Sequence, residues 1–189
     1  MDKFFGNLNL VLGLGFALAG VLMAVFHVDE ANLSAILQWL HVFFGIIWIG
    51  LLYYFNFVQT PVMPTVPAEL KPGVSKYIAP KALFYFRWGA ALTVLTGLIL
   101  AYVNGFAKEA LTFQPGFQLI GTGMWLGLIM GFNVWGVIWP NQKKALGLVE
   151  ADDATKAKAA RVAMLASRTN TLLSIPMLYA MASFQSLPR

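Results

Sequence analysis

His41 is the residue of this chain whose type and position are best suited to chemistry. It lies in residues 35–59, which read AILQWLHVFFGIIWIGLLYYFNFVQ, and no other side chain there titrates near neutral pH. A helix of about 20 apolar residues crosses a bilayer, and an ionisable group inside such a helix is costly enough to indicate a functional site. Histidine is also a common ligand of metals and of haem iron. We therefore predict that His41 ligates a metal centre; the alternative is a buried histidine that is hydrogen-bonded to a serine, a carbonyl or water.

The helix face that carries His41 is predicted to have space beside the imidazole. Phe44, Gly45 and Trp48 follow His41 at i+3, i+4 and i+7 and therefore share its face. Gly45 removes bulk one turn away, which would admit the edge of a porphyrin or a neighbouring helix. We predict a cofactor site that includes His41, Gly45 and Trp48, with haem b as the cofactor.

A second axial ligand could come from three other residues. Met124 and Met177, in two later helices, are expected at about the depth of His41, since each helical residue rises ~1.5 Å. Both are included in the predicted site, because His/Met ligation is a known haem arrangement; the alternative is that they fill the core, as methionine often does. His27 is expected about 10 Å nearer the surface, where a solvated side chain is the alternative. A five-coordinate haem and a water ligand stay open.

The composition is that of an integral membrane protein. The 189 residues are 59% hydrophobic and only 11% charged, against about 25% charged in soluble domains. The absence of cysteine excludes disulfides, cysteine-ligated clusters and haem attached covalently through a C-x-x-C-H motif. The net charge of +5 does not indicate nucleic-acid binding, because the basic residues flank hydrophobic segments. We expect one domain, residues 1–189, embedded in a lipid bilayer.

Five apolar segments predict an all-α membrane protein, a bundle of five transmembrane helices. They cover approximately residues 7–28, 33–58, 83–103, 117–139 and 160–185. Two intervening segments, 60–87 and 143–168, hold ten of the thirteen Lys and Arg residues. By the positive-inside rule both segments are cytoplasmic. We therefore expect the N-terminus in the cytoplasm and the C-terminus on the other side.

Several residues are expected to mark the cytoplasmic ends of the helices. The five prolines in residues 60–81 predict a stiff, extended loop rather than a helix. Asp152 or Asp153 is placed to cap a helix that continues into the last span. Arg87 and Arg168 are expected to extend to the lipid headgroups.

Glycines at four-residue spacing predict close helix packing. Gly123, Gly127 and Gly131 form one face of small residues, which lets helices approach closely in a membrane. We expect this face to pack against the helix of residues 33–58, so that Gly127→Leu would impair folding or assembly.

Three stretches resemble a known family. They read WLHVFFGIIWIGLLYYFNFVQTPVMP at residues 39–64, NVWGVIWPNQKK at 133–144 and ARVAMLASRTNTLLSIPMLYAMA at 160–182. Together they resemble the membrane-embedded N-terminal domain of the bacterial urate oxidases, in which a multi-helix membrane domain precedes a C-terminal cytochrome c. The resemblance implies redox work in a bacterial inner membrane, with the C-terminus in the periplasm and electrons passed to a c-type cytochrome. Because this chain has no cysteine, that cytochrome would be a separate protein.

A second resemblance supports the same histidine. The H-x6-W spacing of His41 and Trp48 is similar to a pattern in the bacterial membrane protoporphyrinogen oxidases, which bind haem b through a membrane histidine. Two functions are therefore expected. One is a redox protein or subunit, the component of an oxidoreductase, that holds haem b on His41 and exchanges electrons with a c-type cytochrome. The other is a haemless accessory subunit that packs against a larger membrane complex through its glycine faces.

Overall fold

The chain folds into helices that form two compact units. The computed structural model describes residues 2–26, 33–184 and 186, and these residues contain no strand. The first unit, Met1–Ile36, contains α1 (Asp2–Phe5) and α2 (Leu8–Phe26), and no residue of α2 is buried within it. The second unit, Leu37–Arg189, contains the other long helices. The predicted all-α class is confirmed for the described residues.

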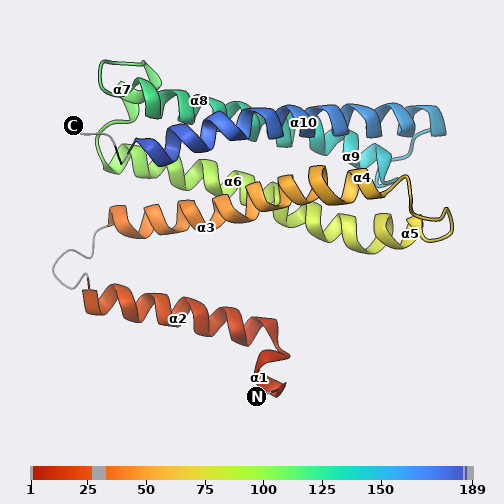
Figure 1. Ribbon diagram of the computed structural model, residues 1–189, viewed down its shortest axis with the longest axis horizontal. Helices are drawn as coiled ribbons and strands as arrows, with labels where there is room; N and C mark the ends of the chain where they lie inside the picture. The colour runs from red at the N-terminus through yellow and green to blue at the C-terminus, as the bar shows by residue number, and fades with distance from the viewer. Residues whose placement is uncertain (1, 27–32, 185, 187–189) are drawn as a thin grey trace. The chain divides into compact units, whose positions relative to one another are not determined.

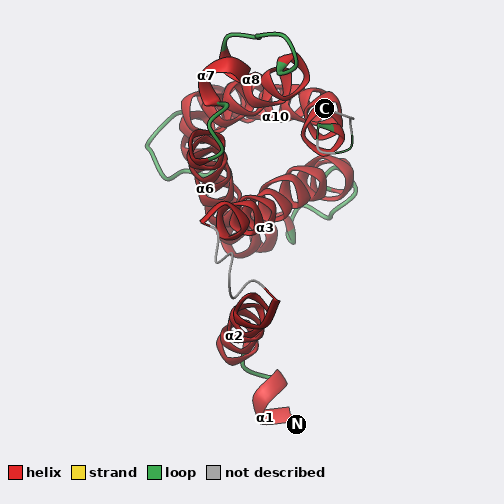
Figure 2. Ribbon diagram, turned by 90° about the vertical axis from the view of Figure 1, so that its left-hand side faces the viewer, coloured by secondary structure: helices red, strands yellow, loops and turns green. Residues whose placement is uncertain are grey.

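Four long helices form the second unit and lie in a ring when viewed along their axes (Figure 2). Sequence neighbours in this ring run in opposite directions (Figure 1). Its elements are α3 (Leu33–Tyr53), η1 (Tyr54–Gln59) and α4 (Thr60–Val62); α5 (Lys71–Gly73), η2 (Val74–Ile78) and α6 (Ala79–Val103); α7 (Ala107–Leu111); α8 (Gln118–Phe132), η3 (Asn133–Ile138) and α9 (Trp139–Ala145); and α10 (Asp153–Ser183).

The π-helical segments η1, η2 and η3 are each followed by a proline. They end two residues before Pro61, Pro80 and Pro140. A proline has no N–H, and its ring clashes with the carbonyl four residues earlier. In all three segments the residue before the proline donates to the carbonyl five residues earlier, as Thr60 does to Phe55. This wider turn accommodates the ring without ending the helix.

The five predicted helices are present, but the proline-rich loop is different from the prediction. Helices reach Val62 and begin again at Lys71, and residues 63–70 form turns, so the extended path predicted for 60–81 is wrong. Among the described residues, four helices are long and apolar enough to cross a membrane: Leu8–Phe26, Leu33–Val62, Lys71–Val103 and Gln118–Ala145. The 31-residue α10 carries more polar residues and is not among them.

Buried polar side chains join α10 to its two neighbours in the ring. Asn170 donates to the Met130 carbonyl at 3.0 Å and accepts from Asn133 at 2.8 Å. On the other side, hydrogen bonds of 2.9 Å and 2.8 Å join α10 to α3 and η1. We call the side chains of these bonds the polar clamp: Tyr53, Asn56, Asn133, Ser167, Asn170 and Ser174. Such interhelical bonds stabilise helix pairs in a membrane, where apolar packing alone gives little preference for protein over lipid.

Candidate functional site

A cavity of about 680 Å³ lies among α3, α6, α8 and α10. Ligand sites in proteins commonly measure about 300–1,000 Å³. The cavity wall contains all five residues of the predicted site: His41, Gly45 and Trp48 on α3, Met124 on α8 and Met177 on α10. The fold therefore brings these residues together around one space, while their binding of a cofactor stays a prediction.

The imidazole of His41 is held in one orientation by α6. Its Nδ1 lies 2.9 Å from the carbonyl oxygen of Thr93. Since a carbonyl only accepts hydrogen bonds, Nδ1 must carry the proton. Nε2 of the neutral ring then has the free lone pair, which is the form that ligates metals. The two alternatives for His41, a hydrogen bond to a carbonyl and metal ligation, are compatible because they use different nitrogens.

Gly97 makes the room that the His41 ring occupies. A β-carbon at position 97 would lie 2.6 Å from Cε1 and 2.8 Å from Nδ1 of His41, closer than real β-carbons approach other atoms. Gly45 has a smaller effect, because a β-carbon there would lie 3.8 Å from Thr93 Cγ2, an ordinary contact. The sequence did not reveal Thr93 or Gly97 as site residues, because their roles depend on how α3 and α6 pair.

Trp48 belongs both to the cavity wall and to the packed core beside it. Its side chain is only 1% exposed, and its Nε1 has no hydrogen-bond partner in the described part of the chain. Helix α6 approaches closely here, since a β-carbon at Gly89 would lie 3.2 Å from the backbone nitrogen of Trp48. The H-x6-W spacing therefore places His41 beside the cavity and Trp48 where the cavity meets the core.

The methionines lie on the wall formed by α8 and α10. Met124 and Met177 are both buried and line the cavity. Met181, one turn after Met177, also lines it and was not predicted. The third candidate for a second ligand, His27, lies outside the described residues. The wall thus offers one imidazole and three thioethers, and a haem needs one or two protein ligands of these kinds.

The glycine face of α8 packs differently from the prediction. A β-carbon at Gly123 would lie 3.1 Å from Ala180 Cβ of α10. One at Gly131 would lie 3.0 Å from Val94 Cγ2 of α6. At Gly127, which lines the cavity, nothing lies within 4 Å. The expectation that this face packs against α3 is wrong: α3 and α8 lie across the ring from each other (Figure 2), and both line the cavity.

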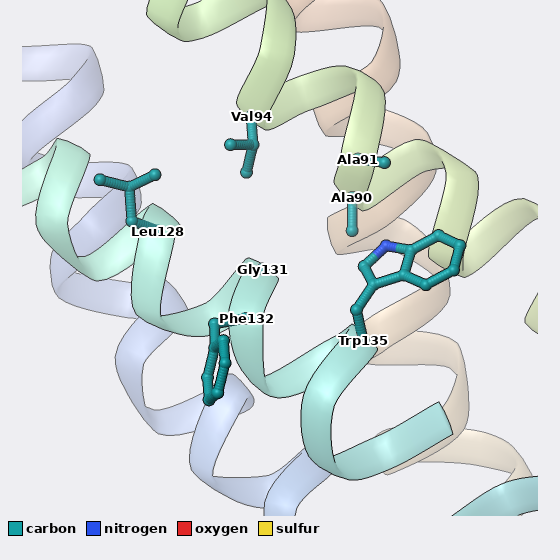
Figure 3. Close-up of a pocket in the computed structure, with 7 residues that line it drawn as sticks. All are labelled: Ala90, Ala91, Val94, Leu128, Gly131, Phe132 and Trp135. Atoms are coloured by element: carbon teal, nitrogen blue, oxygen red, sulfur yellow. The ribbon is translucent and has the colours of Figure 1, made fainter. Parts of the chain in front are cut away.

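A smaller groove of about 250 Å³ lies between α6 and the helix of α8 and η3 (Figure 3). Gly131 leaves the floor of this groove without a side chain, and Trp135 lies at one end of it beside Ala90 (Figure 3). Val94 and Leu128 line both this groove and the larger cavity. The residues around the groove are apolar apart from the Trp135 N–H, which donates to a backbone carbonyl. The groups that could do chemistry are therefore in the larger cavity.

Arg87 is buried instead of extending to the lipid headgroups. Its side chain is 9% exposed, and its guanidinium carbon lies 3.4 Å from the centroid of the Trp139 ring. A cation–π interaction therefore takes the place of the expected contact with lipid. Arg168 is exposed, and its contact with the headgroups stays a prediction. Neither arginine lines the cavity.

Within the described residues there is no group of three or more His, Cys, Asp or Glu side chains that could hold a metal ion. His41 is therefore considered as a single protein ligand of a larger prosthetic group. That arrangement suits haem, whose iron is already held by four porphyrin nitrogens and takes its axial ligands from the protein.

Comparison with known families supports the resemblance over the C-terminal part of the chain. Residues 110–185 match the sequence model of the family described as Urate oxidase N-terminal. The match covers α8, η3, α9 and all of α10, but less than half of the chain. Over these residues the chain is similar to the N-terminal part of urate oxidases; the stretch 39–64, which carries His41, lies outside the match. Comparison with curated proteins and with solved structures finds no match.

Proposed function

We propose that this chain is a redox protein or subunit of the bacterial inner membrane that holds haem b on His41. In this proposal the haem exchanges electrons with a separate c-type cytochrome at the periplasmic face. All five long helices cross the membrane, with the N-terminus in the cytoplasm and the C-terminus in the periplasm. The match to the urate oxidase N-terminal family over residues 110–185 supports the membrane redox context.

The orientation of His41 is the observation that carries the proposal. The Thr93 carbonyl accepts the Nδ1 proton, which leaves the Nε2 lone pair for iron. A carbonyl on the second nitrogen is the usual arrangement around a metal-ligating histidine, since it fixes the ring and raises its basicity. A histidine that served packing alone would not need a cavity of about 680 Å³ beside it.

The remaining wall residues fit a porphyrin. Gly45, Gly97 and Gly127 leave the wall without side chains at three places, and most of the lining is apolar. Gln38 and Asn104 add polar groups toward the end of the ring where α3 begins and α6 ends, as the carboxylates of a haem require. When bound, a haem supplies one-electron chemistry. The residues of this chain bind it, fix its orientation and exclude water.

The distribution of charge supports the proposed orientation in the membrane. Lys71 begins the second long helix of the ring, and Lys143 and Lys144 lie near the end of the third, so they share one end of the unit (Figure 1). By the positive-inside rule that end is cytoplasmic. His41 lies nearer the other end, in the first half of α3, which leaves a short distance to a periplasmic electron carrier.

The test is an optical spectrum of the protein purified in mild detergent. We expect a Soret band with the reduced spectrum of a b-type haem. His41→Ala should abolish that band while the helical circular dichroism is unchanged. Leu95→Ala is the matched control, because Leu95 lies on α6 near Thr93 and is 53% exposed; it should keep the band.

The outcome separates the two predicted functions. If the wild-type protein is colourless after purification and after incubation with haemin, the haem proposal is wrong. The haemless accessory subunit then becomes the better explanation. One observation favours that alternative: Phe84, Tyr85 and Trp88 on α6 are each almost half exposed, as in a surface that meets another apolar helix.

A further inference from the structure

We infer that the cavity takes its ligand from the hydrocarbon phase of the bilayer, through a lateral opening between α3 and α10. The ligand is therefore a largely apolar molecule that partitions into membranes. This inference rests on the proposed function, because it concerns the same cavity. It adds the path by which the ligand enters and the chemical class of that ligand.

The opening follows from how α3 and α10 are joined. Two hydrogen bonds join them on the side of η1: Tyr53 bonds Ser174 at 2.9 Å, and Asn56 donates to Ser167 at 2.8 Å. Nine residues of α10 follow Ser174, and Met177, Leu178, Met181 and Ala182 in this last part line the cavity. The two helices are therefore joined on one side of Ser174 and have the cavity between them on the other side.

The rim of the opening is exposed on the outside of the unit. Val42 and Ile46 on α3 line the cavity and are 47% and 68% exposed. Leu178 on α10 lines the opposite side of the cavity and is 40% exposed. Since residues of the cavity wall on both helices also reach the outer surface, the cavity wall is continuous with the surface between them.

The chemistry of the rim selects the ligand. The rim residues are apolar: Val42, Ile46, Leu178 and Ala182. Gly50, which has no side chain, also lines the cavity. A charged solute would lose its hydration at such a rim without gaining a partner, which is costly. An apolar solute dissolved in lipid loses nothing there. His41 lies on the cavity wall, and the polar residues Gln38 and Asn104, of which Asn104 is exposed, lie toward the end of the ring where α3 begins and α6 ends.

A cysteine inside the cavity tests the route without haem. The chain has no native cysteine, and Gly127→Cys places a thiol where nothing lies within 4 Å of the β-carbon. The full-length variant in liposomes is treated with a membrane-partitioning pyrenyl maleimide or with a membrane-impermeant sulfonated maleimide. We expect the first reagent to label it and the second, added on either side, to leave it unlabelled.

Bulky substitutions then locate the opening. Ile46→Trp with Leu178→Trp should slow labelling by the pyrenyl reagent about tenfold or more, which corresponds to a barrier increase of about 1.4 kcal/mol. Ile46→Trp alone serves if the double variant folds poorly, as judged by its helical circular dichroism. Ala91→Trp, in the groove between α6 and α8, is the matched control and should not slow labelling.

Each other result overturns the lateral opening. Rapid labelling by the sulfonated reagent would show entry from water. Slowing by Ala91→Trp instead of the rim variants would place entry between α6 and α8. No labelling by either reagent would show that the rim is covered. Haem uptake is scored separately: protein that labels as expected but binds no haemin disproves the proposed function and leaves the opening, whereas protein that binds haemin but labels from water disproves the opening alone.

Discussion

The two halves of the four-helix unit are built in opposite ways. In the half that contains η1, η3 and α9, the polar clamp joins α10 to α3, η1 and η3 through partly buried hydrogen bonds. Around it the largest fully buried side chains pack, among them Phe86, Leu52 and Ile138. In the half toward α7, the wall residues surround a cavity of about 680 Å³. There His41 bonds Thr93 across α3 and α6, and small residues and the rings of Phe106, Phe117 and Phe184 pack at the end of the unit.

The difference shows how a small membrane unit can keep a cavity open. An empty space costs packing energy, because the atoms around it lose contacts. In lipid the hydrophobic effect does not drive helices together. Hydrogen bonds between polar side chains and close contacts between small residues must therefore set the distance between helices. The clamp fixes the positions of α3 and α10 at one end, and the helices can then diverge at the other end without falling apart. The clamp and the cavity thus lie in different halves.

The largest expected effect comes from breaking the clamp. Asn170 is fully buried and makes bonds to Met130 and Asn133. Asn170→Leu keeps a similar volume but removes both bonds, and each buried bond left unmade costs about 1 kcal/mol. We expect the free energy of unfolding in detergent, followed by circular dichroism, to fall by about 2 kcal/mol. Thr169→Ala, at the exposed neighbouring position, is the control; equal stability of the two variants would show that the clamp does not hold the unit.

The next largest effect is expected on the cavity side, at Gly97. A β-carbon there cannot coexist with the present position of the His41 ring, so Gly97→Ala should turn the ring away and break its bond to Thr93. Loss of such a supporting bond typically weakens metal affinity about 10–100-fold. We expect haem affinity, measured by titration with haemin, to fall by at least about tenfold.

The free energy of unfolding should change much less in Gly97→Ala than in Asn170→Leu. The alanine gains up to ~1 kcal/mol of helix propensity, which offsets part of the cost of moving the ring. Gly127→Ala is the matched control for stability, since its β-carbon meets open space. Unchanged haem affinity in Gly97→Ala would mean that His41 is not the ligand or that its ring does not need this orientation.

Residue types predicted five residues that line one cavity, but not the contacts that position them. An ionisable group in an apolar segment, a glycine one turn away and methionines at the same depth were enough to select residues that meet in one cavity. Thr93 and Gly97 are ordinary residues of an apolar helix, and nothing in the sequence states the register between α3 and α6. Gly127 was misjudged for the same reason: spacing alone does not distinguish a glycine at a helix contact from one at a cavity.

The ends of the helices were predicted less well than their existence. Hydropathy locates apolar segments, but the prolines were taken to end helices, as they usually do. The widened turns before Pro61, Pro80 and Pro140 instead allow the helices to continue. Such a turn depends on which carbonyl each N–H reaches, and composition does not contain that information. Part of the low hydropathy of α10 has a structural reason, because Ser167, Asn170 and Ser174 belong to the clamp.

Gly127→Leu distinguishes the two halves most directly. At a helix contact this change would impair folding, as first expected from the glycine spacing. Because the position faces the cavity, we now expect the free energy of unfolding to stay within about 0.5 kcal/mol of the wild type or to rise through cavity filling. Haemin binding should be lost, since the side chain occupies the ligand space. Gly123→Leu, which would meet Ala180, is the contrasting variant and should unfold more easily; equal stabilities of the two variants would contradict the assignment.

The smallest effect is expected at the N-terminal cap of α10, the helix that carries half of the clamp residues. Asp152 is the N-cap, as the sequence suggested for Asp152 or Asp153, and its carboxylate accepts from the Thr155 N–H at 2.7 Å and the Thr155 hydroxyl at 3.0 Å. These bonds, first the one from the backbone N–H, lower the pKa of the Asp152 carboxyl below its ordinary value.

A carboxyl whose pKa is lower in the folded state stabilises the fold above its unfolded pKa of about 3.9 and loses that contribution as the pH falls through the folded pKa. Asp152→Ala should therefore lower the thermal midpoint slightly at neutral pH, and the difference from the wild type should shrink once the pH falls below about 4. Asp152→Asn keeps a capping oxygen. At neutral pH its thermal midpoint should lie between those of the wild type and Asp152→Ala, and it should depend less on pH than that of the wild type. Thermal unfolding in detergent between neutral and acidic pH measures these midpoints. If the difference between the wild type and Asp152→Ala grows on acidification, the carboxylate does not stabilise the start of α10.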